Sequence, residues 1–249
     1  MTGKRNAVPA HATLPAFMRN LVVLNAAIVH CTACARLVDY RESIARTKRR
    51  QFKDWTYWGR PVPGFGDERA RLYVLGLAPA AHGGNRTGRV FTGDRSGDWL
   101  YEALHRYGFA NQASSTHRGD GLALKDCYIG AVVRCAPPEN KPAPDEFEHC
   151  RRFLRSELRL LKNQQVVIAL GKIAFDHFLK ACRAEGLQSP SPAPRFSHGA
   201  AIRLPWGVLL LGSYHPSQQN TFTGKLTRAM FHSVFARARR ELRRRSRSA

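Results

Sequence analysis

The sequence predicts an α/β protein, built as a three-layer α/β/α sandwich around a parallel central sheet of roughly four strands. Short apolar runs of strand length recur along the chain, at residues 72–75, 128–133, 166–170 and 208–211. Segments of helical periodicity separate these runs, and strands that alternate with helices imply a parallel sheet covered on both faces. No repeat or change in composition divides the 249 residues. We therefore expect a single domain, 1–249, with residues 1–20 and 246–249 loosely ordered.

The expected helices follow from the spacing of apolar residues and from the turn residues at their ends. The apolar segment 21–29 predicts a first helix that runs into Cys31. A helix is expected at 145–163 because five of its residues share one apolar face: Phe147, Cys150, Phe153, Leu154 and Leu158. Further helices are expected at 99–107, 173–184 and 225–245, with irregular segments at 111–124 and 186–200.

The charge of the chain points to a polyanionic partner. Lys and Arg number 40 against 18 Asp and Glu, for a net charge of +22. Cations that neutralise phosphates release condensed counterions, which favours binding to nucleic acid whatever its sequence. We interpret the arginine-rich end of the last helix, 237–247, as a solvated charged surface, with non-specific DNA contact as the alternative.

No segment is long and apolar enough to span a membrane. The most apolar stretch, 21–29, is too short for a bilayer, and Asn25 interrupts it in a way that fits a signal peptide poorly. We therefore expect a soluble, cytoplasmic protein with no membrane partner. We also expect a monomer.

The stretch from Asp39 to Arg71 is polar and rich in aromatic residues. Cations at Lys48, Arg49, Arg50 and Lys53 alternate with four aromatic side chains, Phe52, Trp55, Tyr57 and Trp58. Such a stretch either grips a phosphate backbone and stacks on bases, or forms a lid that packs its rings on the protein. For Trp55, Tyr57 and Trp58 we favour the lid, packed on the sheet and on the site of the amino-terminal cysteines.

Six cysteines raise the question of a metal site. Cys31 and Cys34 form a CxxC motif at a helix end, which directs two thiolates at one ion or cluster. Cys135, at the end of a strand, and Cys150, in the first turns of a helix, are candidates for two further ligands. A redox pair, a zinc site and an iron–sulfur site all fit this spacing. Cys127 and Cys182 lie in apolar patterns typical of buried structural thiols.

The rest of the chain is organised around residues 72–100. A buried strand at 72–75 is followed by more than a dozen loop residues before the next helix, whose start Asp94 can cap. A connection this long is usually functional, and it leaves the carboxyl end of a strand, where open α/β sheets bind ligands. The glycine spacing matches neither phosphate-binding loop motif. His215, which Pro216 follows, leaves the fourth strand at the same edge of the sheet.

Three sequence segments resemble a known family. Residues 76–89 and 91–98 closely resemble the first motif of the family 5 uracil-DNA glycosylases, and residues 213–227 resemble their second motif. Residues 135–142, with Cys150, are similar to the iron–sulfur enzymes of families 4 and 5. The resemblance implies a bacterial-type, nucleoid-associated hydrolase in base excision repair. Such an enzyme removes uracil and other deaminated or modified bases from DNA and leaves an abasic site.

The resemblance also implies roles for individual residues. His215 donates a hydrogen bond to the departing base, and Asp94 positions the water. Phe91 stacks on the flipped base, and Asn140 pairs with the uracil edge. The main chain of Gly76, Leu77 and Ala78 lies close to the base. The residues expected to contact DNA are Asn85, Arg86, Ser217, Gln218 and Lys225. A [4Fe–4S] cluster is expected on Cys31, Cys34, Cys135 and Cys150.

Three features of the chain depart from other uracil-DNA glycosylase families, and the first two are departures from family 1. Ala78 replaces the Asp that orients the water there, and Ala80 replaces a Tyr that crowds C5 of the pyrimidine, so C5-substituted uracils are expected to enter. Polar residues 218–220 replace the apolar wedge of other families. Because Ala78 cannot orient water, the alternative is a catalytically weak iron–sulfur module that binds nucleic acid. A zinc-stapled structural protein is the third interpretation.

Overall fold

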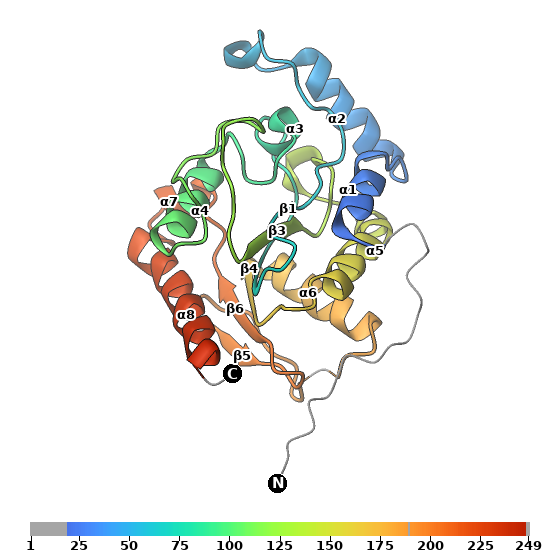
Figure 1. Cartoon of the computed structure of the whole chain (residues 1–249). Coiled ribbons are helices and arrows are strands. Elements are labelled where there is room, and N and C mark those ends of the chain that lie inside the picture. Colours follow the sequence, from blue (N-terminus) through green and yellow to red (C-terminus); the bar gives the residue numbers. More distant parts are fainter. Residues whose placement is uncertain (1–18, 189, 248–249) are drawn as a thin grey trace.

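Six strands form one sheet in the computed structural model, which describes residues 19–188 and 190–247 (Figure 1). The strand order across the sheet is β1-β3-β2-β4-β6-β5. The strands are β1 (Phe65–Gly66), β2 (Leu72–Gly76), β3 (Cys127–Ala131), β4 (Val166–Leu170), β5 (Ala201–Arg203) and β6 (Leu209–Ser213).

The four inner strands, β3, β2, β4 and β6, are parallel, as the sequence predicts. The expectation of a purely parallel, four-stranded sheet is nevertheless wrong at both edges. There β1 pairs antiparallel with β3, and β5 pairs antiparallel with β6. These edge strands are two and three residues long and only partly buried, so they lack the apolar pattern that reveals the inner ones.

Helices cover both faces of the sheet, which confirms the three-layer sandwich (Figure 1). One face packs against α1, α5 and α6, and the other packs against α4 and α8. Successive residues of β2 alternate between the two cores, because Tyr73 and Leu75 belong to the first and Leu72 and Val74 to the second. The longer helices are α1 (Leu21–Val29), α2 (Ala35–Thr47), α4 (Arg95–Arg106), α5 (Pro144–Leu160), α6 (Lys172–Ala184) and α8 (Arg228–Arg247).

The sequence predicts neither the four short helices nor the longer helix α2. The short ones are the 3-10 turns η1 (Arg50–Phe52) and η2 (Pro138–Asn140) and the α-helices α3 (Gly84–Thr87) and α7 (Gln218–Phe222). Helix α2 begins within the turn after Cys34 and occupies part of the stretch that the sequence marks only as polar. Within the described residues, no helix combines the length and apolar character needed to cross a membrane.

The end of α8 is hydrogen-bonded to the segment before β2. Ser246 and Arg247 belong to the helix, although the sequence predicts a loose end from residue 246. The Ser246 hydroxyl donates to the carbonyl of Leu242 (3.0 Å) and accepts from the Arg71 guanidinium (2.6 Å). These bonds tie the helix end to the residue that precedes β2. The expected looseness of residues 1–18 and 248–249 lies outside the described residues.

A buried ionic network joins the sheet to α5. The guanidinium of Arg134, 1% exposed, lies 2.5 Å from the Glu157 carboxylate, which is fully buried. Tyr73 of β2 donates its hydroxyl to the same Glu157 oxygen at 2.6 Å. Breaking such a pair by removing one partner costs about 3–5 kcal/mol, because it strands a buried charge. The network therefore fixes the segment that carries Cys135 against the helix that carries Cys150.

Candidate active site and cysteine cavity

The loop between β2 and α4, residues 77–94, leaves the carboxyl edge of the sheet. We call it the catalytic loop. The main chain at its start is fixed to the segment after β3, because the carbonyls of Gly76 and Leu77 accept from the N–H groups of Val132 (3.0 Å) and Val133 (2.9 Å). Gly76 and Leu77, two residues expected near the base, therefore sit in a rigid part of the site, with Ala78 directly after them.

A buried arginine braces the middle of the catalytic loop. Arg89 donates to the hydroxyls of Thr92 (3.0 Å) and Ser115 (2.6 Å) and pairs with the Asp120 carboxylate (2.6 Å). Burial opposes ionisation of Asp120, but the Arg89 guanidinium outweighs it and holds the pKa of this carboxyl well below its usual range. The irregular segment 111–124 thus serves as a support for the loop.

Phe91 adopts a backbone conformation that bulky residues avoid. Its φ is +52°, in the left-handed region, where residues typically cost about 1–3 kcal/mol and cluster at functional sites. This turn brings the ring beside His215, with centroids 5.8 Å apart and planes tilted by 30°. The ring also rests on Gly76, where an added Cβ would lie 2.5 Å from Cζ. Glycine at position 76 is therefore a requirement of this packing.

His215 follows β6 and stands at the same edge. Its carbonyl accepts from the side-chain amide of Asn220 at 2.8 Å, and Ser217 caps α7 by accepting from the Asn220 N–H at 3.3 Å. The side chain is partly buried, and burial lowers the pKa of His215 to about 4. The imidazole is therefore neutral at pH 7, and one ring nitrogen carries a proton that it can donate.

Asp94 is the N-cap of α4, so the helix-cap role considered from the sequence is real. One carboxylate oxygen accepts from the N–H of Gly97 at 3.0 Å. The other oxygen points at Gly83, where any Cβ would collide with it. Burial raises the pKa of Asp94, while the N–H groups of Gly97 and Ser96 act against that rise. The cap holds the carboxylate in place without occupying both of its oxygens.

Asn140 lies on the surface, at the end of the turn that follows Cys135. Asn140 and its neighbour Glu139 both have positive φ, +58° and +53°. Two successive residues in the left-handed region are uncommon, and Asn tolerates that region better than most residues. The turn presents the exposed Asn140 side chain at a fixed place beside the cysteine segment.

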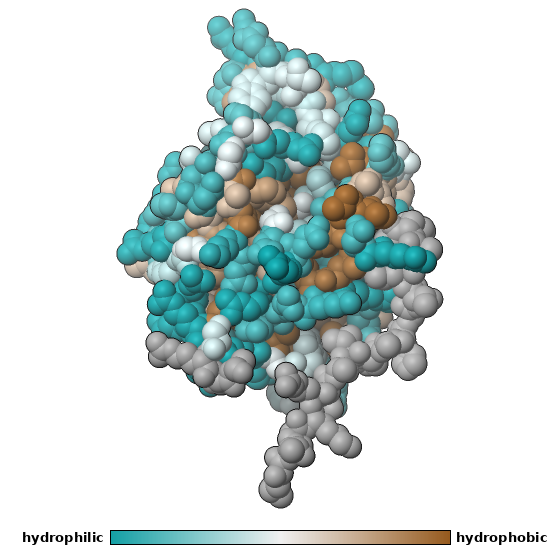
Figure 2. Space-filling view, in the orientation of Figure 1, coloured by the Kyte–Doolittle hydropathy of each residue, from teal (hydrophilic) through white to brown (hydrophobic). Residues whose placement is uncertain are grey.

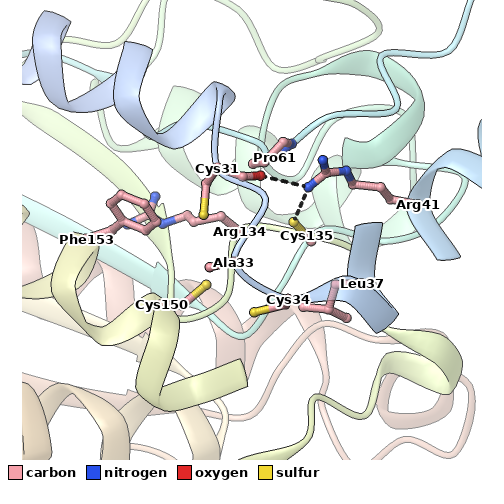
Figure 3. A pocket seen from close by; sticks show the side chains of 10 residues that line it. All are labelled: Cys31, Ala33, Cys34, Leu37, Arg41, Pro61, Arg134, Cys135, Cys150 and Phe153. Atoms are coloured by element: carbon pink, nitrogen blue, oxygen red, sulfur yellow. Dashed lines mark hydrogen bonds between the residues drawn. The ribbon is translucent and has the colours of Figure 1, made fainter. Parts of the chain in front are cut away.

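Four of the six thiols face one cavity (Figure 3). Cys31 and Cys34 flank the turn between α1 and α2, Cys135 follows β3, and Cys150 lies on α5. Cys127 and Cys182 are buried elsewhere, in β3 and α6, as predicted. The rest of the lining is contributed by Ala33, Leu37, Arg41, Pro61, Arg134 and Phe153.

Nitrogen groups surround the thiols of this cavity. Arg41 donates to the Cys135 sulfur at 3.0 Å and to the Cys31 carbonyl at 3.3 Å (Figure 3). Arg152 donates to the Cys31 sulfur at 3.4 Å. His149 Nδ1 lies 3.4 Å from the Cys34 sulfur. Burial raises the pKa of Cys34, Cys135 and Cys150 to about 11. Across the described chain, no three His, Cys, Asp or Glu side chains form a set that could hold one metal ion.

Comparison with known proteins agrees with this geometry. A model of the uracil DNA glycosylase superfamily matches residues 63–239. A type-5 uracil-DNA glycosylase of Mycobacterium bovis is 53% identical over 218 residues, which cover 87% of this chain and 80% of the relative. The chain belongs to the type-5 uracil-DNA glycosylase family. The type-5 enzyme of Thermus thermophilus is 50% identical over 84% of this chain and 93% of its own. A type-4 enzyme of Thermotoga maritima is 34% identical over only 47% of this chain and 54% of its own.

Two residues expected to contact DNA in this type-5 chain are buried. Asn85 is 1% exposed, and its amide donates to the Arg41 carbonyl at 3.1 Å. Arg86 is 4% exposed and donates to the carbonyls of His82 and Gly93, each at 2.8 Å. The structure therefore corrects the expectation that these side chains face DNA, because both are buried and donate to carbonyls inside the protein. They shape the catalytic loop.

The other three expected DNA contacts lie on or near the surface beside His215. Gln218 and Lys225 are exposed, and Ser217 is partly buried as the cap of α7. The Lys225 ammonium lies 5.0 Å from the centre of the Tyr214 ring. Their positions at the edge of the site are compatible with DNA contact, and their role in DNA binding stays a prediction.

Two further contacts at the site are not predicted from the sequence. The Tyr57 hydroxyl and His82 Nδ1 are 3.0 Å apart, so the aromatic lid contacts the catalytic loop, while Trp58 packs against the core that includes β2 and β3 residues. At the other side, the Arg95 guanidinium lies 4.4 Å over the ring of Phe222, which is 66% exposed. The only sequence signal for the second feature is a lone Phe in a polar segment after the second motif.

Proposed function

We propose that this chain hydrolyses the N-glycosidic bond of uracil in DNA and leaves an abasic site for base excision repair. The observation that carries this proposal is the meeting of both family motifs at one sheet edge, where strained Phe91 lies against His215. The relatives at 50–53% identity are named type-5 uracil-DNA glycosylases. The net charge of +22 suits a DNA substrate. We propose further that it works as a monomer in the bacterial cytoplasm, at the nucleoid.

In this proposal His215 acts on the departing base. Glycosidic cleavage has an oxocarbenium-like transition state, in which negative charge develops on the base. A neutral imidazole keeps one N–H group, which can donate a hydrogen bond to the O2 atom of the base as that negative charge grows. The low pKa of His215 keeps it in this neutral form across the physiological range. The Asn220 bond to its backbone fixes the position of the donor.

Asp94 acts on the other side of the bond. Ala78 has no group that can orient water, so a carboxylate must come from elsewhere in the catalytic loop. Asp94 is held by the Gly97 N–H through one oxygen, and in this proposal its second oxygen accepts from water. A negative carboxylate there also stabilises the positive sugar of the transition state.

Phe91 and Asn140 recognise the flipped base. The Phe91 ring offers a face for stacking, and its neighbour Gly76 leaves the ring room against the strand end. Asn140 carries both a donor and an acceptor, which match the N3–H and O4 groups of uracil. Ala80 presents only a methyl group, so we propose that C5-substituted uracils and other deaminated bases also enter.

We propose that Cys31, Cys34, Cys135 and Cys150 hold a [4Fe–4S] cluster. The residues fit such a group because four thiols from separate segments face one cavity, and N–H donors from Arg41 and Arg152 approach two of their sulfurs. Bound iron would displace the thiol protons, which the free protein retains up to high pH. The cluster would hold the α1–α2 turn against α5. Absorbance near 400 nm in the purified protein distinguishes it from zinc.

The test is an excision assay. A duplex oligonucleotide with one uracil is incubated with the protein and then cleaved at abasic sites with alkali. We expect abasic sites at the uracil only, and a panel of hypoxanthine and C5-substituted uracils then defines the range of bases. Binding to DNA without abasic sites would instead favour the catalytically weak iron–sulfur module that Ala78 suggests.

A further inference from the structure

A basic projection stands beside the catalytic loop. Residues 48–55, which follow α2 and include η1, carry four cations and one carboxylate, Asp54. Figure 1 shows this segment at the top of the molecule, beyond α3, and Figure 2 shows a largely hydrophilic surface there. We call residues 48–55 the basic arm.

The basic arm is clamped to the catalytic loop through Arg86. The rings of Phe52 and Trp55 both lie against its guanidinium, with centroids 3.9 and 4.1 Å from Cζ. Cation–π contacts of this kind are worth about 0.5–2 kcal/mol each, and more when they are desolvated. The same guanidinium donates to the carbonyl of Gly93, the residue before Asp94. The arm is thus mounted on the group that shapes the water-binding end of the site.

Backbone hydrogen bonds also attach the basic arm to the catalytic loop. The N–H groups of Trp58 and Gly59 donate to the carbonyls of Arg86 (2.9 Å) and Asn85 (3.0 Å). At the base of the arm, Lys48 has a φ of +51° and donates its ammonium to the Lys53 carbonyl at 3.1 Å. A merely solvated charged turn needs neither this strain nor these anchors. The geometry holds the arm at one place relative to the site.

Three cations of the arm point to solvent. Arg49, Arg50 and Lys53 are exposed, and none of them forms an ion pair with a carboxylate of the described residues. Like charges held close together repel one another, and an anionic partner offsets this cost. The polyanion that reaches this edge of the molecule is the DNA that delivers the base to Phe91 and His215.

We propose that the basic arm binds backbone phosphates of the DNA that flank the target base. It contributes affinity and orientation and does not read base identity, because phosphate contacts carry no sequence information. The proposal rests on the proposed function, since that function makes DNA the substrate.

The test compares two triple variants that lose the same charge. The arm variant is R49Q/R50Q/K53Q. The control, K162Q/K180Q/R183Q, removes three exposed cations from the turn before β4 and from α6, and all six positions are exposed. Binding of a fluorescent undamaged duplex is measured against salt. The slope of log K against log salt is about −0.9 per phosphate contact. The slope of the arm variant should therefore be less steep than that of the wild type by up to about 2.7, and the slope of the control should be almost unchanged.

The outcomes separate the arm from the chemistry. With a uracil duplex, the arm variant should need more protein to reach half of its maximal single-turnover rate, and the control should not. Equal slopes in the arm variant and the wild type, or equal losses in both variants, would overturn the proposal. A rate loss that excess protein does not restore would overturn it too, because that places the cations in catalysis. Wild-type protein that forms no abasic sites would refute the proposed function alone, since duplex binding is measured without uracil.

Discussion

At the scale of single residues, the site depends on a glycine that lets an aromatic ring approach. An alanine at position 76 would place Cβ 2.5 Å from Phe91 Cζ, so the ring or the strand end must move. We expect Gly76→Ala to lower the single-turnover excision rate and the affinity for free uracil. Gly119→Ala is the matched control, since its Cβ meets nothing closer than 3.6 Å. Equal effects of the two substitutions on excision would show that the Phe91 contact is irrelevant.

His215 should contribute as a neutral donor. One preorganised transition-state hydrogen bond is worth about 2.7–4 kcal/mol, so His215→Ala should slow single-turnover excision by roughly 100–1000-fold. Burial lowers the folded-state pKa of His215 from 6.5 to about 4, so the unfolded chain binds more protons between these values. The wild-type rate should be level from pH 6 to 8 and should fall only near pH 4. Through His215, the free energy of unfolding should fall as the pH falls from 6.5 to 4, and it should not depend on this residue above pH 6.5. A rate that falls with an apparent pKa near 6.5 would contradict this protonation state.

Asp94 has two roles that substitutions can separate. Asn is as good an N-cap as Asp, so Asp94→Asn should leave the melting temperature nearly unchanged, whereas Asp94→Ala should cost about 1 kcal/mol of stability. For excision, Asp94→Asn should lose less activity if positioning of water dominates, because the amide oxygen still accepts a hydrogen bond. The excision rate of Asp94→Asn should be as low as that of Asp94→Ala if the negative charge of the carboxylate also stabilises the sugar. Full activity in Asp94→Ala would reduce this carboxylate to a helix cap.

At the scale of elements, the strongly patterned parts of the chain were predictable. The inner strands, α5 and α6 follow from apolar runs and periodicity, and the positions of His215 after a strand and of Asp94 at a helix start follow from the sequence, while their roles stay predictions. Edge strands β1 and β5 were not predictable, because they are held by pairing with β3 and β6 and carry no pattern of their own. Burial of Arg86 was also hidden, since only tertiary contacts bring Phe52 and Trp55 onto its guanidinium.

The cysteine cavity lies between the α1–α2 turn, the segment after β3 and α5, so the loss of a bound cluster should lower the stability of the protein. Cys135→Ala should give colourless protein with reduced iron and a lower melting temperature. Cys182→Ala, in the core of α6, should keep its colour and its iron content, although a buried substitution also costs some stability. Iron content and absorbance near 400 nm are the readouts. Equal iron in the two variants would refute the ligand assignment.

At the scale of the whole molecule, the excess of 22 positive charges should dominate encounters with undamaged DNA. The cations reach the surface from several elements, including the basic arm and α8, so many phosphates can be neutralised at once. Each contact releases counterions, and the binding constant for undamaged duplex should therefore fall linearly in a plot of log K against log salt. A protein with six or more such contacts loses on the order of 1000-fold in affinity between 50 and 200 mM salt. Fluorescence anisotropy across that range, with circular dichroism to verify that the fold is unchanged, measures the slope. A slope near zero would mean that the charge serves another purpose, and that the interface with DNA is dominated by contacts other than phosphates.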